Sequence, residues 1–200
     1  VIWILGSTMM ILCPHFLIDI MKNLVIIGAG GMGRTIFDVA RESIGYGIEY
    51  TIKGFIDDNL SALDGFEDYP PMLGTISHYL PEVDDVFTFS IGGESRRGCI
   101  EYLMERNAKF INIVHCTARI GSNVRMGEGN VIGAFTSLGA GCNIGSYNMI
   151  QSYTVIGHDA KIGNFNRIDT HVTCVGGIQI GNETTIHTSA VINHKVIVED

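Results

Sequence analysis

The chain has 200 residues, of which 46% are hydrophobic, 17% are charged and 8% are aromatic, and this composition excludes a disordered chain, a collagen helix and a coiled coil. Its net charge of −8 reflects 13 Lys and Arg against 21 Asp and Glu, and no basic face typical of a nucleic-acid binder is visible. We therefore expect a globular protein of one or two domains without a nucleic-acid partner.

The five cysteines are widely spaced and include no C-x-x-C pair: Cys13, Cys99, Cys116, Cys142 and Cys174. An odd number at such spacing argues against a disulfide framework and against a zinc knuckle. The pattern fits a reducing compartment, and we expect a cytoplasmic protein.

Residues 1–20 are strongly apolar and contain neither Lys nor Arg. A signal peptide needs a basic start. His15 and Asp19 shorten an apolar run that would have to be roughly 20 residues long to cross a membrane. We expect residues 1–20 to be an upstream or extraneous segment, Met21 to be the natural start, the chain to be a fragment, and stable membrane insertion to be absent.

The next segment, residues 21–109, is typical of a small α/β domain. Leu24–Ile27 is a short apolar run of the kind buried in parallel sheets, and it leads through a G-x-G-x-x-G motif at 28–33 into a helical pattern. Free N–H groups at such a helix start form an anion site. Strands are also predicted at 50–56 and 86–91, and a helix at 94–106.

The glycine motif alone would suggest NAD. About ninety residues provide only one mononucleotide-binding half, whereas a dinucleotide usually needs two, so an NAD enzyme is disfavoured and a single nucleotide diphosphate fits better. Asp57 and Asp58 stand where an acid would bind a ribose hydroxyl. They could equally form a solvated turn at the end of a strand.

Residues 110–200 contain a six-residue repeat. Every sixth residue from Val114 to Val198 is apolar, most of them Ile, and Gly follows at eight of these fifteen places. A strict six-residue period predicts a parallel β-helix, in which three hexapeptides make one triangular coil of eighteen residues. Residues eighteen apart then stack about 4.8 Å above one another.

This repeat resembles the left-handed β-helix of hexapeptide-repeat acyltransferases. With the motifs GAGGMG (28–33), FIDD (55–58), FSIGG (89–93) and VIGHDAKIGNF (155–165) in this order, the chain resembles the sialic acid O-acetyltransferase family. It is most similar to the branch of UDP-4-amino-sugar N-acetyltransferases, as in bacillosamine synthesis. We therefore expect an α/β half-Rossmann domain at 21–109 and an all-β left-handed parallel β-helix at 110–200, incomplete at its C-terminus.

The resemblance implies acetyl-CoA as co-substrate, a nucleotide sugar as acceptor, a homotrimer with active sites between subunits, and a setting in surface polysaccharide synthesis. It implies His158 as the catalytic base, followed by Asp159 where the family more often has Glu. The residues that it implies for the acceptor are Gly30, Gly31, Met32, Asp57, Asp58 and Gly92, and those for acetyl-CoA are Arg167, Gly176 and Thr188.

The chemistry of a histidine suits this reaction, because an imidazole titrates near neutral pH and an adjacent carboxylate can fix its tautomer. By pattern alone, His158 is more simply a solvent-facing corner residue, two places after the inward Ile156. Two positions depart from the family: Arg167 replaces a usual His, and His187 replaces a Gly at the CoA wall. We expect donor geometry and acceptor choice to differ accordingly.

Three alternatives stay open. One is O-acetylation of sialic acid or another surface sugar, and the second is a non-catalytic trimeric scaffold or binding protein. The third is a zinc site like that of gamma-class carbonic anhydrases, which needs three convergent His ligands. His158 and His194 are two coils apart, roughly 9–10 Å, so we expect no metal.

Overall fold

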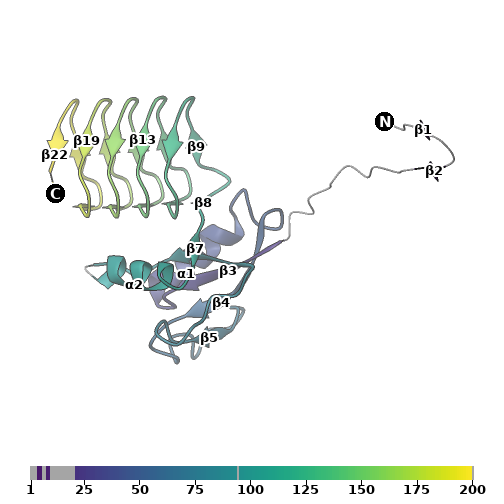
Figure 1. Cartoon of the computed structure of the whole chain (residues 1–200). Helices are drawn as coiled ribbons and strands as arrows, with labels where there is room; N and C mark the ends of the chain where they lie inside the picture. The colour runs from purple at the N-terminus through teal and green to yellow at the C-terminus, as the bar shows by residue number, and fades with distance from the viewer. Residues whose placement is uncertain (1–3, 6–7, 10–20, 94, 200) are drawn as a thin grey trace.

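The computed structural model describes residues 4–5, 8–9, 21–93 and 95–199 (Figure 1). Within the expected extraneous segment it describes only the short antiparallel pair β1 (Ile4–Leu5) and β2 (Thr8–Met9), so the expectation for 1–20 lies largely outside the described residues. No helix in the described ranges is long and apolar enough to cross a membrane.

The first large unit is a five-stranded parallel sheet in the order β5-β4-β3-β6-β7. Its strands are β3 (Lys22–Ile27), β4 (Tyr50–Ile56), β5 (Met72–Gly74), β6 (Asp85–Phe89) and β7 (Lys109–Phe110). Helix α1 (Gly31–Arg41) follows β3, and α2 (Ser95–Met104) follows β6. The order matches one half of a Rossmann fold, as predicted. Strand β5 has no counterpart in the sequence-based prediction, because three half-buried residues show no periodicity.

The second unit is a parallel β-helix of two-residue strands, whose faces we name by position. The docked face contains β8 (Ile113–Val114), β11 (Val131–Ile132), β14 (Met149–Ile150), β17 (Arg167–Ile168) and β20 (Thr185–Ile186). The second face contains β9 (Arg119–Ile120), β12 (Ser137–Leu138), β15 (Val155–Ile156), β18 (Thr173–Cys174) and β21 (Val191–Ile192). The third face contains β10 (Arg125–Met126), β13 (Asn143–Ile144), β16 (Lys161–Ile162), β19 (Gln179–Ile180) and β22 (Ile197–Val198).

Each of these strands ends on an apolar residue of the six-residue repeat. The register pairs Ile132 with Ile150 and Ile150 with Ile168, which confirms the predicted coil of eighteen residues. All three isoleucines are fully buried. Burial of one such side chain contributes roughly 1.5–3 kcal/mol, so the column forms the core of the β-helix. Ile120 departs from the pattern and is 40% exposed, because β9 is the terminal strand of its sheet.

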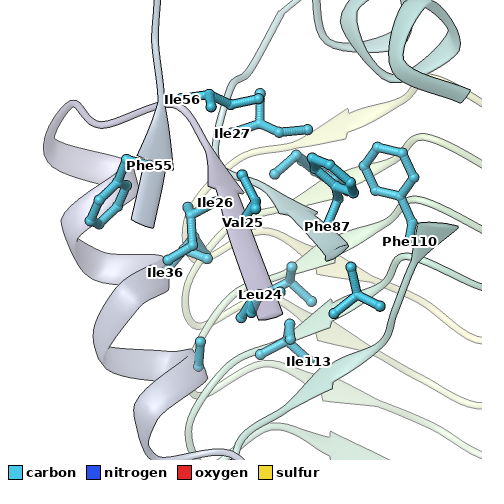
Figure 2. Close-up of a cluster of buried hydrophobic side chains, with 14 of the residues drawn as sticks. Leu24, Val25, Ile26, Ile27, Ile36, Phe55, Ile56, Phe87, Phe110 and Ile113 are labelled. Atoms are coloured by element: carbon cyan, nitrogen blue, oxygen red, sulfur yellow. The ribbon is translucent and has the colours of Figure 1, made fainter. Parts of the chain in front are cut away.

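The hydrophobic core of the α/β domain continues onto the docked face. Figure 2 shows Leu24 of the central strand close to Ile113 of β8, whose side chain belongs to the core of the α/β domain and not to the interior of the prism. Val131 and Met149 of the next two coils belong to the same buried cluster. The α/β domain is therefore packed against one particular side of the prism.

A ladder of buried asparagines lines the corner that joins the third face to the docked face, which we call the third corner. The Oδ1 atom of Asn148 accepts the backbone N–H of Asn166 at 2.8 Å, and its Nδ2 donates to Oδ1 of Asn130 at 3.0 Å and to the carbonyl of Gly163 at 2.9 Å. All three asparagines are completely buried. Because the ladder links successive coils, it satisfies backbone groups that the corner would otherwise leave unpaired.

We predict that Asn148→Ala lowers the free energy of unfolding by roughly 2–4 kcal/mol, because buried polar groups on the two neighbouring coils lose their hydrogen-bond partner. Asn143→Ala, on the exposed third face, serves as the matched control and is expected to change stability by less than about 0.5 kcal/mol. Urea denaturation measures both values. Equal stability of the two variants would contradict a structural role for the ladder.

Candidate active site

The glycine motif lies at the carboxyl edge of the parallel sheet, between β3 and α1. A Cβ atom at position 33 would lie 2.2 Å from the carbonyl oxygen of Gly28, so only glycine lets α1 start this close to the strand. Gly30 caps α1 without a side-chain hydrogen bond. The first N–H groups of α1, including those of Gly31 and Met32, therefore have no capping side chain and can receive an anionic group.

The two aspartates after β4 lie at this same edge. Asp57 accepts the backbone N–H of Ala29 at 2.7 Å through Oδ2 and that of Asn59 at 2.8 Å through Oδ1. Asp58 is exposed and accepts the N–H of Ile76 at 3.1 Å through Oδ1 only. Asp57 thus ties the glycine loop to the end of β4, while Asp58 keeps one carboxylate oxygen open to a ligand.

His158 and Asp159 occupy the corner between the second and third faces, the second corner. The Nδ1 atom of His158 lies 2.7 Å from Oδ2 of Asp159. Because a carboxylate only accepts, Nδ1 carries the proton and Nε2 presents a lone pair, which is the tautomer that a general base requires. Both side chains are about two-thirds exposed, so a substrate can reach them.

Gly176 stacks one coil above His158 and makes room for its ring. A Cβ atom at position 176 would lie 2.5 Å from Nε2 of His158 and 2.8 Å from both Cδ2 and Cε1. Any side chain there would displace the imidazole. The next residue in this column, His194, hydrogen-bonds through Nδ1 to the carbonyl oxygen of Gly176.

Within one chain, the residues predicted to bind acetyl-CoA lie far from one another. His158 and Gly176 share the second corner, which lies opposite the docked face of the prism. Thr188 is exposed at the corner between the docked and second faces, and Arg167 lies on the docked face itself. One β-helix alone therefore does not enclose all of these side chains around one ligand.

Arg167 lies instead beside the α/β domain. Its Nη1 atom would be 3.4 Å from a Cβ at Gly92, and its Nε donates to Oδ1 of Asp169 at 2.6 Å. Asp169 is buried, also accepts from Nε2 of Gln151 at 2.7 Å, and has Nδ1 of His187 at 3.5 Å. The eighteen-residue spacing of 151, 169 and 187 is the sequence signal that could have revealed this polar column.

Arg96 is a further residue that the sequence analysis did not identify. It lies in the first turn of α2, directly after the Gly92-Gly93 turn, and only 6% of it is exposed. A cation in the first turn of a helix opposes the helix dipole, and that mismatch was the available signal. As for metals, no group of three or more His, Cys, Asp or Glu side chains in the described ranges is arranged to hold an ion.

The chain thus combines a half-Rossmann domain, docked on a hexapeptide β-helix, with a histidine–carboxylate pair at one corner of that helix. Residues 23–101 match the family described as the PglD N-terminal domain. Over 117 residues, the chain is 30% identical to UDP-N-acetylbacillosamine N-acetyltransferase of Bacillus subtilis (strain 168). That alignment covers 56% of this chain and 51% of the relative, so the chain spans about half the length of this curated protein.

Two solved structures share the fold. The acetyltransferase domain of PglB from Neisseria gonorrhoeae FA1090 matches with a TM-score of 0.80 at 24% identity, covering 90% of this chain and 86% of that one. WeeI from Acinetobacter baumannii AYE matches with a TM-score of 0.71 at 23% identity, covering 86% and 81%. The predicted fold, a half-Rossmann domain followed by a left-handed β-helix, is confirmed, as is the resemblance to bacillosamine-type sugar acetyltransferases.

We predict that Asp57→Ala lowers the free energy of unfolding by about 1–3 kcal/mol, because the N–H groups of Ala29 and Asn59 lose their acceptor. Asp57→Asn keeps one acceptor oxygen, so its free energy of unfolding should lie between those of Asp57→Ala and the original protein. Asp64→Ala, at an exposed position, is the control and should change little. Thermal and urea unfolding measure the effect. If Asp57→Ala leaves the free energy of unfolding unchanged, Asp57 has no structural role and is a candidate for ligand binding alone.

Proposed function

We propose that the protein is an acetyl-CoA-dependent acetyltransferase that acetylates the amino group of a nucleotide-linked 4-amino sugar. The observation that carries the proposal is the hydrogen-bonded pair of His158 and Asp159, which leaves Nε2 as a base beneath Gly176. The relative from Bacillus subtilis is named for N-acetylation of such a sugar, and the PglB domain has a structure with acetyl coenzyme A. Both names support this choice of acceptor and donor.

The reaction follows from these side chains. Nε2 of His158 accepts a proton from the sugar amine as its nitrogen attacks the thioester carbonyl of acetyl-CoA. The C–N bond forms, the C–S bond breaks, and the imidazolium returns the proton to the departing thiolate, giving CoA thiol and the N-acetyl sugar. Asp159 stabilises the transient imidazolium and holds the tautomer through Nδ1–H.

We assign the acceptor to the α/β domain, residues 21–109, and acetyl-CoA to the β-helix, residues 110–200. Acceptor groups would meet the glycine loop, Asp58 and Gly92 at the carboxyl edge of the sheet. His158 lies at the corner opposite the docked face, so it is far from an acceptor bound to the α/β domain of its own chain. It could act only on an acceptor held by a second chain. This arrangement supports a homotrimer in which the histidine of one subunit faces the acceptor held by its neighbour.

A cytoplasmic location completes the proposal, since acetyl-CoA and nucleotide sugars are made there. Four cysteines in the described part of the chain are free: Cys99, Cys116, Cys142 and Cys174. Free thiols are typical of a reducing compartment.

The test of the activity is release of thiol from acetyl-CoA with a panel of acceptors. The panel contains UDP-4-amino sugars, UDP-N-acetylglucosamine, which has no free amine, and free sialic acid. Release with the nucleotide amino sugars alone is expected. Release with sialic acid alone would move the assignment to O-acetylation, and no release with any acceptor would contradict the proposed enzyme class.

We predict that His158→Ala lowers kcat roughly 10²–10⁴-fold while the oligomeric state and acetyl-CoA affinity persist, because only proton transfer is lost. His171→Ala removes an exposed histidine from the same coil at a different corner and serves as the control. Steady-state kinetics and calorimetric binding of CoA separate the two effects. A His158→Ala enzyme with full turnover would refute the general base.

We predict that Gly176→Ala lowers kcat roughly 10²-fold, because the new methyl group pushes the imidazole out of position. The exposed ring can swing toward solvent, so the melting temperature should change little. Gly98→Ala, in α2 with open space around it, is the matched control and should keep full activity. If Gly176→Ala turns over normally, the position of His158 beneath this glycine is irrelevant to catalysis.

A further inference from the structure

A cavity of about 190 Å³ lies between the start of α2 and the docked face, and we call it the arginine cavity. Its lining includes Arg96 and Arg97 from α2, and Arg167, Phe165 and Glu183 from the β-helix. In Figure 1, α2 lies alongside the β-helix, and the bond from Arg96 to the carbonyl of Asn166 joins the two. The cavity is smaller than the roughly 300–1,000 Å³ pockets that enclose whole ligands, so it suits one chemical group of a larger molecule.

The three guanidinium groups differ in how their charge is balanced. Arg97 pairs with both Glu101 and Glu183. Arg167 pairs with Asp169 through Nε, and within the described chain its terminal nitrogens, of which Nη1 lies beside Gly92, have no carboxylate partner. These two residues are therefore at least partly neutralised.

Arg96 has no carboxylate partner among the described residues. Its Nη1 donates to the carbonyl oxygen of Asn166 at a long 3.5 Å, and its guanidinium lies 5.5 Å from the ring of Phe89. Only 6% of the residue is exposed, so bulk water solvates its charge poorly. Burial and the neighbouring charge of Arg167 together lower the pKa of Arg96, although Glu183 opposes this.

The helix adds to this unbalanced positive charge. Arg96 and Arg97 lie in the first turn of α2, where the helix dipole is positive, and that turn contains no acidic residue. A buried cation at such a position is unfavourable unless an anion joins it. Among the described residues, the positive charge of Arg96 between α2 and the docked face is therefore not balanced by a paired carboxylate.

We infer that the arginine cavity binds an anionic oxygen group of the acceptor, a carboxylate or a phosphate, between the guanidinium groups of Arg96 and Arg167. Both are planar donors suited to such oxygens. The group belongs to the acceptor because Arg167 adjoins Gly92 of the α/β domain, whereas His158 of the same chain lies at the opposite corner. That last assignment rests on the proposed function, but binding of the anion does not.

The test is calorimetric binding to the protein without acetyl-CoA. UDP is compared with uridine, and glucuronate with its uncharged methyl ester, so that phosphate and carboxylate are distinguished. At least one anion should bind more tightly than its neutral analogue, and Arg167→Gln and Arg96→Gln should weaken it roughly tenfold or more. Loss confined to UDP identifies a phosphate, and loss confined to glucuronate identifies a sugar carboxylate.

Two controls keep the result interpretable. Arg125→Gln removes an exposed arginine from the third face and should bind the anion with the same affinity as the original protein. Arg96→Met should raise the melting temperature without ligand, since it removes an uncompensated buried charge, while abolishing the anion-induced rise. The inference is overturned if neither anion binds, if affinity is the same in both Gln variants and the control, or if Arg96→Met destabilises the protein while Arg167→Gln leaves anion affinity unchanged.

The outcome is separable from that of the acetyltransferase assay. Anion binding through Arg96 and Arg167 without thiol release from any acceptor would support the site and contradict the proposed reaction. If Arg96→Gln and Arg167→Gln change neither the rate of thiol release nor the affinity for the anion, the reaction is supported and the site is refuted.

Discussion

The vertical register of the β-helix is the constraint on which the rest of the structure depends. Each coil has eighteen residues, and parallel backbone pairing fixes every residue directly above the one eighteen places earlier. A side chain in such a column has no lateral freedom to avoid its neighbours. The residue type at a position in one coil therefore limits the residue types that fit at the same position in the next coil. This applies to the buried column of Ile150 and also to the exposed corner of His158, above which only Gly176 leaves room.

The corners of the prism use this constraint in different ways. At the third corner, amide side chains of Asn130, Asn148 and Asn166 satisfy one another and the backbone, which rigidifies the stack. At the second corner, Gly176 leaves a space that the ring of His158 occupies. The first arrangement stabilises the coil, and the second makes a reactive side chain accessible.

Packing of the α/β domain on one face decides where the chemistry can occur. The continuous core from Leu24 to Met149 holds the docked face against the α/β domain. It brings Arg167 to Gly92 and Arg96, and it leaves His158 on the far side of the prism. The proposed anion site, to which Arg96 of α2 and Arg167 of the β-helix contribute, and the proposed base therefore lie on different sides of the prism.

The coil, its inward residues and the strand–glycine turn–helix start can be derived from the amino-acid sequence alone, because they depend on local periodicity and on residues with one strong backbone preference. The resemblance to a known family also singled out His158, whereas the repeat pattern alone favoured a solvent-facing corner residue. Three further features emerge only from packing in three dimensions: the face that the α/β domain covers, the hydrogen bond of Asp57 to the glycine loop, and the cavity shared by Arg96 and Arg167. The contacts of Asp57 with Ala29 and of Arg96 with Arg167 join residues 28 and 71 positions apart, and the docking contacts join residues still farther apart. At such separations no sequence period indicates which side chains will meet.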